Sequence, residues 1–457
     1  MKIEKKAFSA ILLCCAVLVA GPFGDVRAQA DPSVKNAKAG PESPAGDALR
    51  RAPLLGADTV WADGPHKLIE GWQDKGLGDE LAEGLKAAGI SSLRMNFAGL
   101  YSPRGAEASD RVKAENKMSN QFPWFPIDDY LGWVASHDFT TVIGVNVEEG
   151  PDVASDIVRK VIDRGIKSKL VAVELSNEPW LNHRPWLPEE YAARAADVIE
   201  RLTPFGVRFA LPLTVGKDNN TPTRLSDNEW SARMLRALDG RVKLRARPDV
   251  LGVLHLYGRG VRGGTIKQFD DLVRPFAPSM QYLVTEFNIR LGLEGNPHLT
   301  NKYAMEFARK LAEVMAQPEV EAMYVHAVPY HSVVYWSNGK PDKKNRATVV
   351  GQRDARLTAE QLTRGWHVTP AGRVYKLYSE LAWNGELLDF KGGDKQSYWA
   401  VRSSGGKLIT TLLNDSNKET RKRVAFSGRE MTLTAPARSI VCFDRNGLEV
   451  ARLSLPY

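Results

Sequence analysis

Two glutamates lie at the ends of apolar stretches that are far apart in the chain. Glu178 is in VAVELSNEPW, from Val171 to Trp180, and Glu286 is in YLVTEFN, from Tyr282 to Asn288. Each stretch has the composition of a buried strand that stops at a polar turn. Two carboxyl groups brought together from such strand ends can hydrolyse a glycosidic bond, because one protonates the leaving oxygen while the other attacks the sugar or activates water. The structural alternatives are that Glu178 caps a helix and that Glu286 is an ordinary acidic strand end.

The elements that must position these glutamates alternate between strand-like and helix-like segments from Leu54 onward. Eight such units predict an α/β fold, a (β/α)8 TIM barrel, in which side chains at the carboxyl ends of the strands converge at one mouth. An open doubly wound sheet is the competing architecture, but no glycine-rich dinucleotide loop follows the first strand. The predicted strands are 54–60, 92–97, 140–147, 170–175, 208–215, 250–257, 282–287 and 320–328. Glu178 therefore follows the fourth strand and Glu286 ends the seventh.

The pattern changes after Trp383. Short strands broken by Ser-Ser-Gly-Gly and Asn-Asp-Ser-Asn turns predict a smaller C-terminal β-sandwich domain packed on the barrel. We expect the catalytic barrel to span residues 51–382 and the β-sandwich to span residues 383–457. The predicted strands of the second domain are 397–402, 407–414, 422–426, 431–434 and 439–443.

The N-terminal segment has the features of an export signal. Residues 1–30 combine a lysine-bearing start, a short apolar run and an Ala-Gln-Ala ending, and residues 31–50 are rich in Ala, Pro, Gly and Ser. We therefore expect a cleaved signal peptide, a disordered leader and a periplasmic or secreted protein without a transmembrane segment. Cleavage would leave Cys442 as the single cysteine and +6 of the formal charge of +8, a mild basic bias that points away from nucleic acid.

Three short motifs, in this order and on these strands, resemble the clan A glycoside hydrolases. They are Asn177-Glu178-Pro179 after the fourth strand, His255-Leu256-Tyr257 on the sixth and Thr285-Glu286 at the end of the seventh. The resemblance covers Leu54 to about Trp383, and the appended β domain is similar to one that several families of the clan carry. The eighth predicted strand departs from the pattern, because it lacks the tryptophan that many clan members place there as a sugar platform.

The resemblance implies a retaining mechanism with a role for each matching residue. Glu178 would be the acid/base and Glu286 the nucleophile. Asn177 would bind the sugar 2-hydroxyl, Tyr257 would donate a hydrogen bond to Glu286, and His255 would line the same wall. Arg94, on the second strand, would hold the nucleophile ionised; as a buried charge it needs a partner, which Glu286 or Glu174 can supply. An ion pair that serves only structure and a buried core histidine are the alternatives for Arg94 and His255.

Aromatic and basic residues follow several of the predicted strands and suggest a substrate. Trp180 could stack on a pyranose ring or could anchor its loop by packing. Arg184 and Arg259 could bind carboxylates in two-pronged fashion, or could pair with nearby acids. The functional hypothesis is an exported glycoside hydrolase whose substrate is a polysaccharide or oligosaccharide, including an acidic, uronic-acid-containing one.

Two rival functions use the same residues. A transglycosylase would replace water by a sugar hydroxyl in the second step, and a polysaccharide-binding or export protein would keep the fold without catalysis. We expect no metal and no organic cofactor, because the sequence has no histidine pair at ligand spacing and no phosphate-cradling loop.

Overall fold

The computed structural model describes the barrel and the C-terminal β region with gaps at several loops. The described residues are 50–58, 75–95, 127–180, 186–215, 225–258, 263–289, 299–326, 333–341, 347–349, 363, 365–382, 385–392, 395–403, 405–426 and 429–457. The predicted signal peptide and nearly all of the predicted leader lie outside them.

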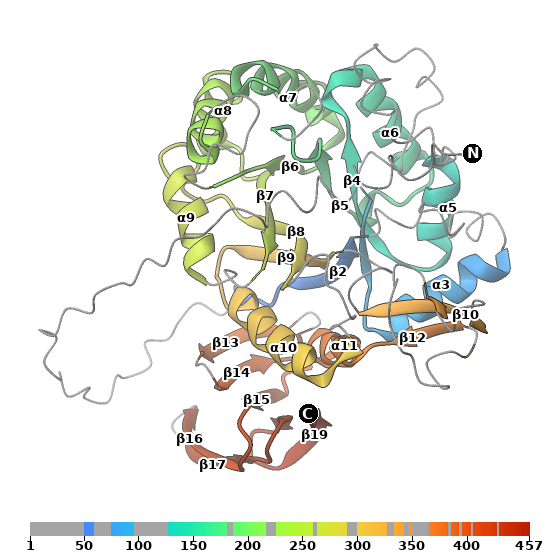
Figure 1. The fold of residues 1–457 in the computed structure, drawn as a ribbon. Coiled ribbons are helices and arrows are strands. Elements are labelled where there is room, and N and C mark those ends of the chain that lie inside the picture. The colour runs from blue at the N-terminus through green and yellow to red at the C-terminus, as the bar shows by residue number, and fades with distance from the viewer. Residues whose placement is uncertain are drawn as a thin grey trace, which may run out of the picture.

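Eight parallel strands close into the predicted barrel, which confirms the fold class (Figure 1). The strands are β2 (Leu54–Asp58), β3 (Ser92–Met95), β4 (Thr140–Val145), β5 (Leu170–Leu175), β6 (Phe209–Pro212), β7 (Val250–Tyr257), β8 (Tyr282–Asn288) and β9 (Val320–Val325). Each strand pairs with the next, and β9 closes the circle by pairing with β2, Leu54 opposite Ala322. All eight predicted strands are present, and most are shorter than predicted.

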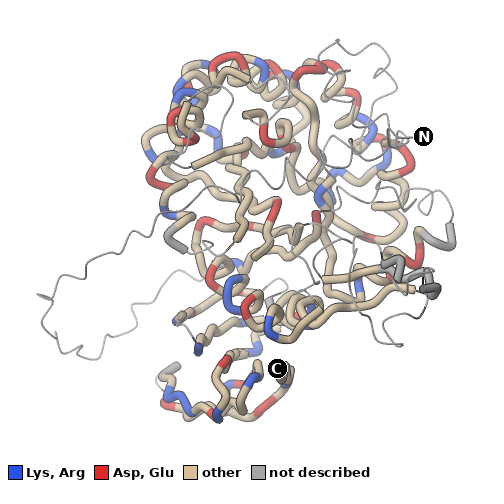
Figure 2. The backbone as a smooth tube through the Cα atoms, in the orientation of Figure 1, with Lys and Arg blue, Asp and Glu red and all other residues tan. Residues whose placement is uncertain are grey.

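Helices surround the barrel and bury their apolar faces against it. They are α3 (Lys75–Ala87), α5 (Ile127–Ser136), α6 (Pro151–Asp163), α7 (Pro188–Leu202), α8 (Asp227–Val242), α9 (Gly263–Val273), α10 (Asn301–Met315) and α11 (Pro370–Ala382). Basic and acidic residues are interspersed along the outer helices (Figure 2), and several of them pair between α7 and α8, such as Arg233 with Glu189. No helix in the part of the chain that the structure describes has the length and apolar character needed to span a membrane.

Inside the barrel, an apolar layer supports a charged one. Val142, Ala172, Leu251 and Leu283 belong to the inner apolar cluster. Because successive residues of a strand point to opposite sides, the residue two places after Ala172 in β5 again points inward, and it is the fully buried Glu174. The polar site is therefore built on a packed base.

The C-terminal region forms two antiparallel layers. A six-stranded sheet has the order β1-β13-β14-β15-β18-β19, and the hairpin β16–β17 covers it through a second apolar cluster. On the other side of the sheet, Trp399 packs edge-on against Tyr378 of α11. The strands are β1 (Arg50–Arg51), β13 (Glu386–Lys391), β14 (Gln396–Arg402), β15 (Leu408–Asn414), β16 (Thr420–Phe426), β17 (Arg429–Ala435), β18 (Ser439–Phe443) and β19 (Glu449–Ser454).

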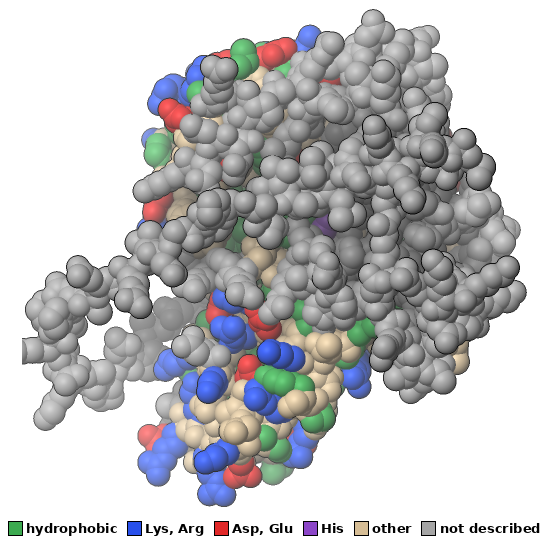
Figure 3. Space-filling model, in the orientation of Figure 1, with side chains coloured by type: hydrophobic (Ala, Val, Ile, Leu, Met, Phe, Trp, Pro, Cys, Tyr) green, Lys and Arg blue, Asp and Glu red, His purple; other side chains and the backbone are tan. Residues whose placement is uncertain are grey.

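Two features of this part were not predicted from the sequence. The strand β1 lies before the barrel in the chain but pairs with β13, so segments from both sides of the barrel sequence contribute to the C-terminal sheet. A separate three-stranded sheet, β11-β10-β12, lies between β9 and α11 in the chain; its strands are β10 (Val334–Pro341), β11 (Ala347–Val349) and β12 (Gly365–Val368). On the face of the molecule in Figure 3, basic, acidic and apolar side chains are interspersed over the C-terminal region.

Candidate active site

A strained turn after β5 carries Glu178. Ser176 and Glu178 have left-handed backbone conformations, with φ of 70° and 38°, which are uncommon for residues other than glycine. Ser176 holds this turn against the end of β4: its backbone N–H donates to the Val145 carbonyl at 2.8 Å, and its hydroxyl accepts from the Val147 N–H at 3.1 Å. The turn therefore fixes the direction of the Glu178 side chain.

Arg94 of β3 is the fully buried cation of the site. Its Nε and Nη2 donate to the two carboxylate oxygens of Glu174 at 2.8 and 2.6 Å, and its Nη1 donates to Glu286 Oε1 at 2.7 Å. Nη2 also donates to Asn177 Oδ1 at 2.7 Å, and Nη1 lies 3.4 Å from Asp58 Oδ1. Burial lowers the pKa of Arg94, but the carboxylates of Glu174, Asp58 and Glu286 raise it well above its ordinary value.

Glu286 is surrounded by hydrogen-bond donors and positive charge. Arg94 binds its Oε1, while the Tyr257 hydroxyl donates to its Oε2. The Nδ1 atoms of His255 and His326 lie 3.5 and 3.7 Å from the same Oε2. Burial raises the pKa of Glu286, but His255, His326, Arg94 and the Tyr257 hydrogen bond together hold it well below its ordinary value, so the carboxylate is ionised at neutral pH.

His255 connects the two glutamates. Its Nδ1 lies 2.8 Å from Glu178 Oε1, and its Nε2 lies 3.1 Å from Thr285 Oγ1. A register shift makes this possible: Leu254 pairs with Val284 while His255 pairs with Glu286, so Thr285 is an extra residue in β8. Burial lowers the pKa of His255, whereas Glu286 and Glu178 raise it, and the net direction is upward.

The two glutamates are close together and differently exposed. One carboxylate oxygen of Glu178, one nitrogen of His255 and one carboxylate oxygen of Glu286 all lie within 4.8 Å of one another. Catalytic carboxyl groups are about 5–5.5 Å apart in retaining glycosidases and about 6.5–9.5 Å apart in inverting ones. The Glu178 side chain is 25% exposed and that of Glu286 is 8% exposed. The spacing fits the retaining geometry, with Glu178 the more accessible to solvent.

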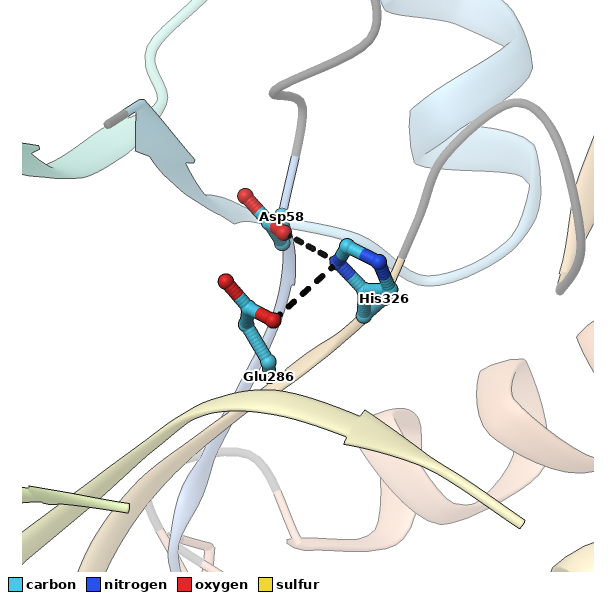
Figure 4. Close-up of side chains that lie close together, drawn as sticks. All are labelled: Asp58, Glu286 and His326. Atoms are coloured by element: carbon cyan, nitrogen blue, oxygen red, sulfur yellow. Dashed lines mark hydrogen bonds and ion pairs between the residues drawn. The ribbon is translucent and has the colours of Figure 1, made fainter. Parts of the chain in front are cut away.

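Sequence reasoning missed two residues of this site, Asp58 and His326. Asp58 ends β2, and His326 directly follows β9, at the strand where the expected tryptophan is missing. The His326 Nδ1 lies 2.5 Å from Asp58 Oδ2, and the same nitrogen faces Glu286 (Figure 4). Both residues are polar side chains at the carboxyl end of a barrel strand, and this position was the signal that could have identified them.

Other predicted substrate-binding residues lie elsewhere. Trp180 is 6% exposed and packs edge-on against Trp230 in the hydrophobic core, a placement that favours packing over sugar stacking. Arg184 and Arg259 lie outside the described residues. Asn177, His255, Tyr257 and Arg94 are brought together with the two glutamates, although Arg94 and Tyr257 contact Glu286 rather than an open surface.

The carboxylate and imidazole groups form two clusters with the donor types of a metal site. One is Asp58, Glu286 and His326, and the other is Glu178, His255 and Glu286. The first fits a divalent cation poorly, because the Arg94 guanidinium already lies 3.4 and 2.7 Å from its two carboxylates and would repel the ion. In the second, Glu286 is again held by Arg94, and His255 is already hydrogen-bonded to Glu178. The site therefore resembles an ion-paired network more than a metal centre.

Glu149 is a further acidic group near the rim of the barrel. It ends the short 3-10 helix η4 (Val147–Glu149) that follows β4, beside the Ser176 turn. Burial, together with the neighbouring Glu148, raises the pKa of Glu149 to about 7. Glu149 thus titrates near neutral pH.

The buried ion pairs of Arg94 predict a loss of stability when this residue is replaced. Replacing Arg94 by Met leaves Glu174, Glu286 and Asp58 without their cation, so we expect the free energy of unfolding to fall by about 3–5 kcal/mol. Denaturant unfolding of the variant measures this. The matched control is Arg233→Met, which removes the exposed pair with Glu189 and should change stability little. Equal stability of the two variants would show that Arg94 does not hold the carboxylates together.

The raised pKa of Glu149 predicts how the stability of the protein changes with pH. A carboxyl group whose folded pKa is raised favours the protonated form, so its contribution to folding is present below the unfolded pKa and is lost as the pH rises through about 7. Wild type should therefore lose stability between pH 5 and 8 relative to Glu149→Gln, by up to about 3 kcal/mol. Unfolding free energies measured across this pH range test it. Parallel curves for the two proteins would contradict the assignment.

Several solved structures have folds similar to that of this chain. No family model and no curated protein matches the chain. Among solved structures, it is similar to SrfJ from Salmonella typhimurium, with 13% identity, a TM-score of 0.53 and coverage of 85% of this chain and 88% of that one. It is similar to a GH30 endoxylanase from Clostridium papyrosolvens, with 11% identity, a TM-score of 0.50 and coverage of 86% and 96%.

A third similar structure comes from another glycoside hydrolase family. It is a GH39 β-xylosidase from Caulobacter crescentus, with 14% identity, a TM-score of 0.51 and coverage of 82% of this chain and 83% of that one. At these identities the likeness establishes the fold. The chain therefore has a (β/α)8 barrel similar to the folds of these structures, and a barrel is the fold that its sequence predicted.

Proposed function

We propose that this protein is a retaining glycoside hydrolase. The observation that carries the proposal is the approach of Glu178 and Glu286 to within 4.8 Å, oxygen to oxygen, in unlike surroundings. Glu286 is buried among Arg94, Tyr257 and two histidines, whereas Glu178 is partly exposed and bonded to His255. Carboxyl groups placed in such different environments divide the work of a nucleophile and an acid.

The first step follows from these surroundings. Glu286, ionised, attacks the anomeric carbon and forms an ester, while Glu178 gives its proton to the leaving oxygen as the glycosidic bond breaks. The His255 Nδ1 then donates to the Glu178 carboxylate, which stabilises the charge that Glu178 has acquired.

The second step reverses the roles. Glu178 takes a proton from water, the resulting hydroxide attacks the anomeric carbon, and Glu286 leaves as a carboxylate that Arg94 and Tyr257 stabilise. Asn177 assists in positioning: Arg94 holds its carbonyl oxygen, so its amide N–H group is the part left to donate to a sugar hydroxyl.

The glutamate pair gives a direct test on a panel of neutral and uronic-acid polysaccharides. Glu286→Gln and Glu178→Gln should each lower the release of reducing ends by about a thousandfold or more. On aryl glycosides with a good leaving group, Glu178→Gln should keep a fast first step and show a slow second one, because such a leaving group needs no acid.

The matched control is Glu190→Gln on the exposed side of α7, which should keep full activity. If the two active-site variants cleave as fast as this control, the proposed function is wrong. Products longer than the substrate would identify transfer to a sugar hydroxyl in place of hydrolysis.

We propose further that the protein is exported and acts on an acidic glycan. The signal-like residues 1–30 and the net positive charge of the remaining chain support these proposals. The basic residues expected near the cleft, Arg184 and Arg259, supply the recognition.

The two arginines give a test of substrate charge. Arg184→Ala and Arg259→Ala should each lower kcat/KM on the acidic glycan about tenfold or more, and should leave cleavage of a neutral glycan nearly unchanged. Comparative kinetics on the two classes measures this, with Arg233→Ala as the control at an exposed site. An unchanged preference in both variants would contradict an acidic substrate.

A further inference from the structure

The charges at the barrel mouth do not balance without the histidines. Four carboxylates of the described residues meet there: Asp58, Glu174, Glu178 and Glu286. Among the described residues, Arg94 contacts three of them, Asp58, Glu174 and Glu286, and Glu174 takes two of its hydrogen bonds. Buried carboxylates are stable as anions only when cations or hydrogen-bond donors compensate them.

His326 is placed to supply part of the missing positive charge. Its Nδ1 lies 2.5 Å from Asp58 Oδ2 and 3.7 Å from Glu286 Oε2, while its other ring nitrogen points away from both carboxylates (Figure 4). The Asp58 side chain is fully buried and that of His326 is 11% exposed. A proton on Nδ1 therefore faces two carboxylates in a site that excludes most water.

The backbone of His326 is tied to the residues that follow the nucleophile. Its N–H donates to the Phe287 carbonyl at 2.9 Å, and its carbonyl accepts from Asn288 Nδ2 at 2.5 Å. The Tyr303 hydroxyl in turn donates to Asn288 Oδ1 at 2.5 Å. His326 and Glu286 are thus held on one rigid unit, so the distance between them is fixed by the fold.

We propose that Asp58 and His326 form an ion pair that positions the nucleophile Glu286 and keeps the site electrically neutral throughout the reaction. The proposal rests on the proposed function. Asp58 and His326 are positioning residues: they act through Glu286 and do not touch the sugar.

With this pair, the net charge of the site is the same before the first step and after it. Before the reaction, Asp58, Glu174 and Glu286 are ionised and face Arg94 and two imidazolium rings, while Glu178 carries its proton. After Glu286 has formed the ester and Glu178 has given up its proton, the ionised groups are Asp58, Glu174 and Glu178, again three against three cations. The negative charge has passed between the two carboxylates that His255 already contacts, at 3.5 and 2.8 Å.

Asp58 has a particular role in the covalent intermediate. Esterified Glu286 no longer compensates the His326 imidazolium, and Asp58 remains as its partner at 2.5 Å. The groups that face His326 directly are Asp58 from β2, Tyr257 from β7 and Glu286 from β8. Arg94 from β3 pairs with the same two carboxylates, Asp58 and Glu286. Both carboxylates raise the pKa of His326 against the effects of burial and Arg94.

The first test needs no substrate. With ¹⁵N-labelled histidine, nuclear magnetic resonance reads the protonation state of each of the eight rings as the pH is varied. His326 should titrate above the value it has in the urea-unfolded chain. Its midpoint should fall by about one pH unit or more in Asp58→Asn and also fall in Glu286→Gln.

The matched control is Asp79→Asn, which removes the partner of the distant His137 and should leave the His326 midpoint unchanged. If Asp58→Asn does not fold, the wild-type titration still decides the proposal. A neutral His326 ring throughout the range from pH 5 to 7, or a midpoint that does not move in Asp58→Asn, would overturn it.

The second test uses activity. His326→Gln should lower kcat/KM about 10- to 100-fold and move the acid limb of its pH profile to higher pH, because the carboxyl of Glu286 then loses a positive neighbour. Asp58→Asn should lower kcat/KM to a similar extent, because His326 then loses the carboxylate that holds it. The double variant should be no worse than the poorer single one. An acid limb that stays in place in His326→Gln would overturn the proposal. Absence of glycosidase activity in wild type would instead contradict the proposed function and leave the titration result unaffected.

Discussion

The buried guanidinium of Arg94 is the constraint on which the site depends. A charge in the interior of a barrel is stable only if acidic partners enclose it. Arg94 meets this requirement through hydrogen bonds to Glu174 in β5, to Glu286 in β8 and to Asn177, which follows β5. These contacts join β3, β5 and β8, so the electrostatics that stabilise the barrel interior also fix the positions of the reacting groups.

The backbone at the ends of β5 and β8 also positions the residues of the site. The strained Ser176 turn directs Glu178, and the extra residue in β8 places His255 beside Glu286. Backbone strain and strand irregularities of this kind concentrate at functional sites, because the surrounding hydrogen bonds offset their cost. The result is an asymmetric pair, with one glutamate held among cations and the other hydrogen-bonded to the His255 imidazole and partly exposed to solvent.

The sequence predicted the parts of this arrangement that depend on local patterns. Short aliphatic runs that end in polar turns located the barrel strands, and the position of Glu178 and Glu286 at two such ends indicated a shared site. The contact between Asp58 and His326 joins residues 268 positions apart, and it depends on the closure of β2 against β9, which no local pattern reports. Trp180 shows the opposite problem: a tryptophan after a strand has the same local pattern whether it packs inward, as here against Trp230, or faces a ligand.

In the proposed reaction, Glu286 becomes covalently bound to the sugar. The most direct measurement is mass spectrometry of the protein after treatment with a series of 2-deoxy-2-fluoro glycosides, which form the ester but hydrolyse it slowly. We expect an added mass of one glycosyl unit on the peptide that contains Glu286, and none in Glu286→Gln. A glycosyl adduct on any other residue, or turnover that inverts the anomeric configuration, would contradict it.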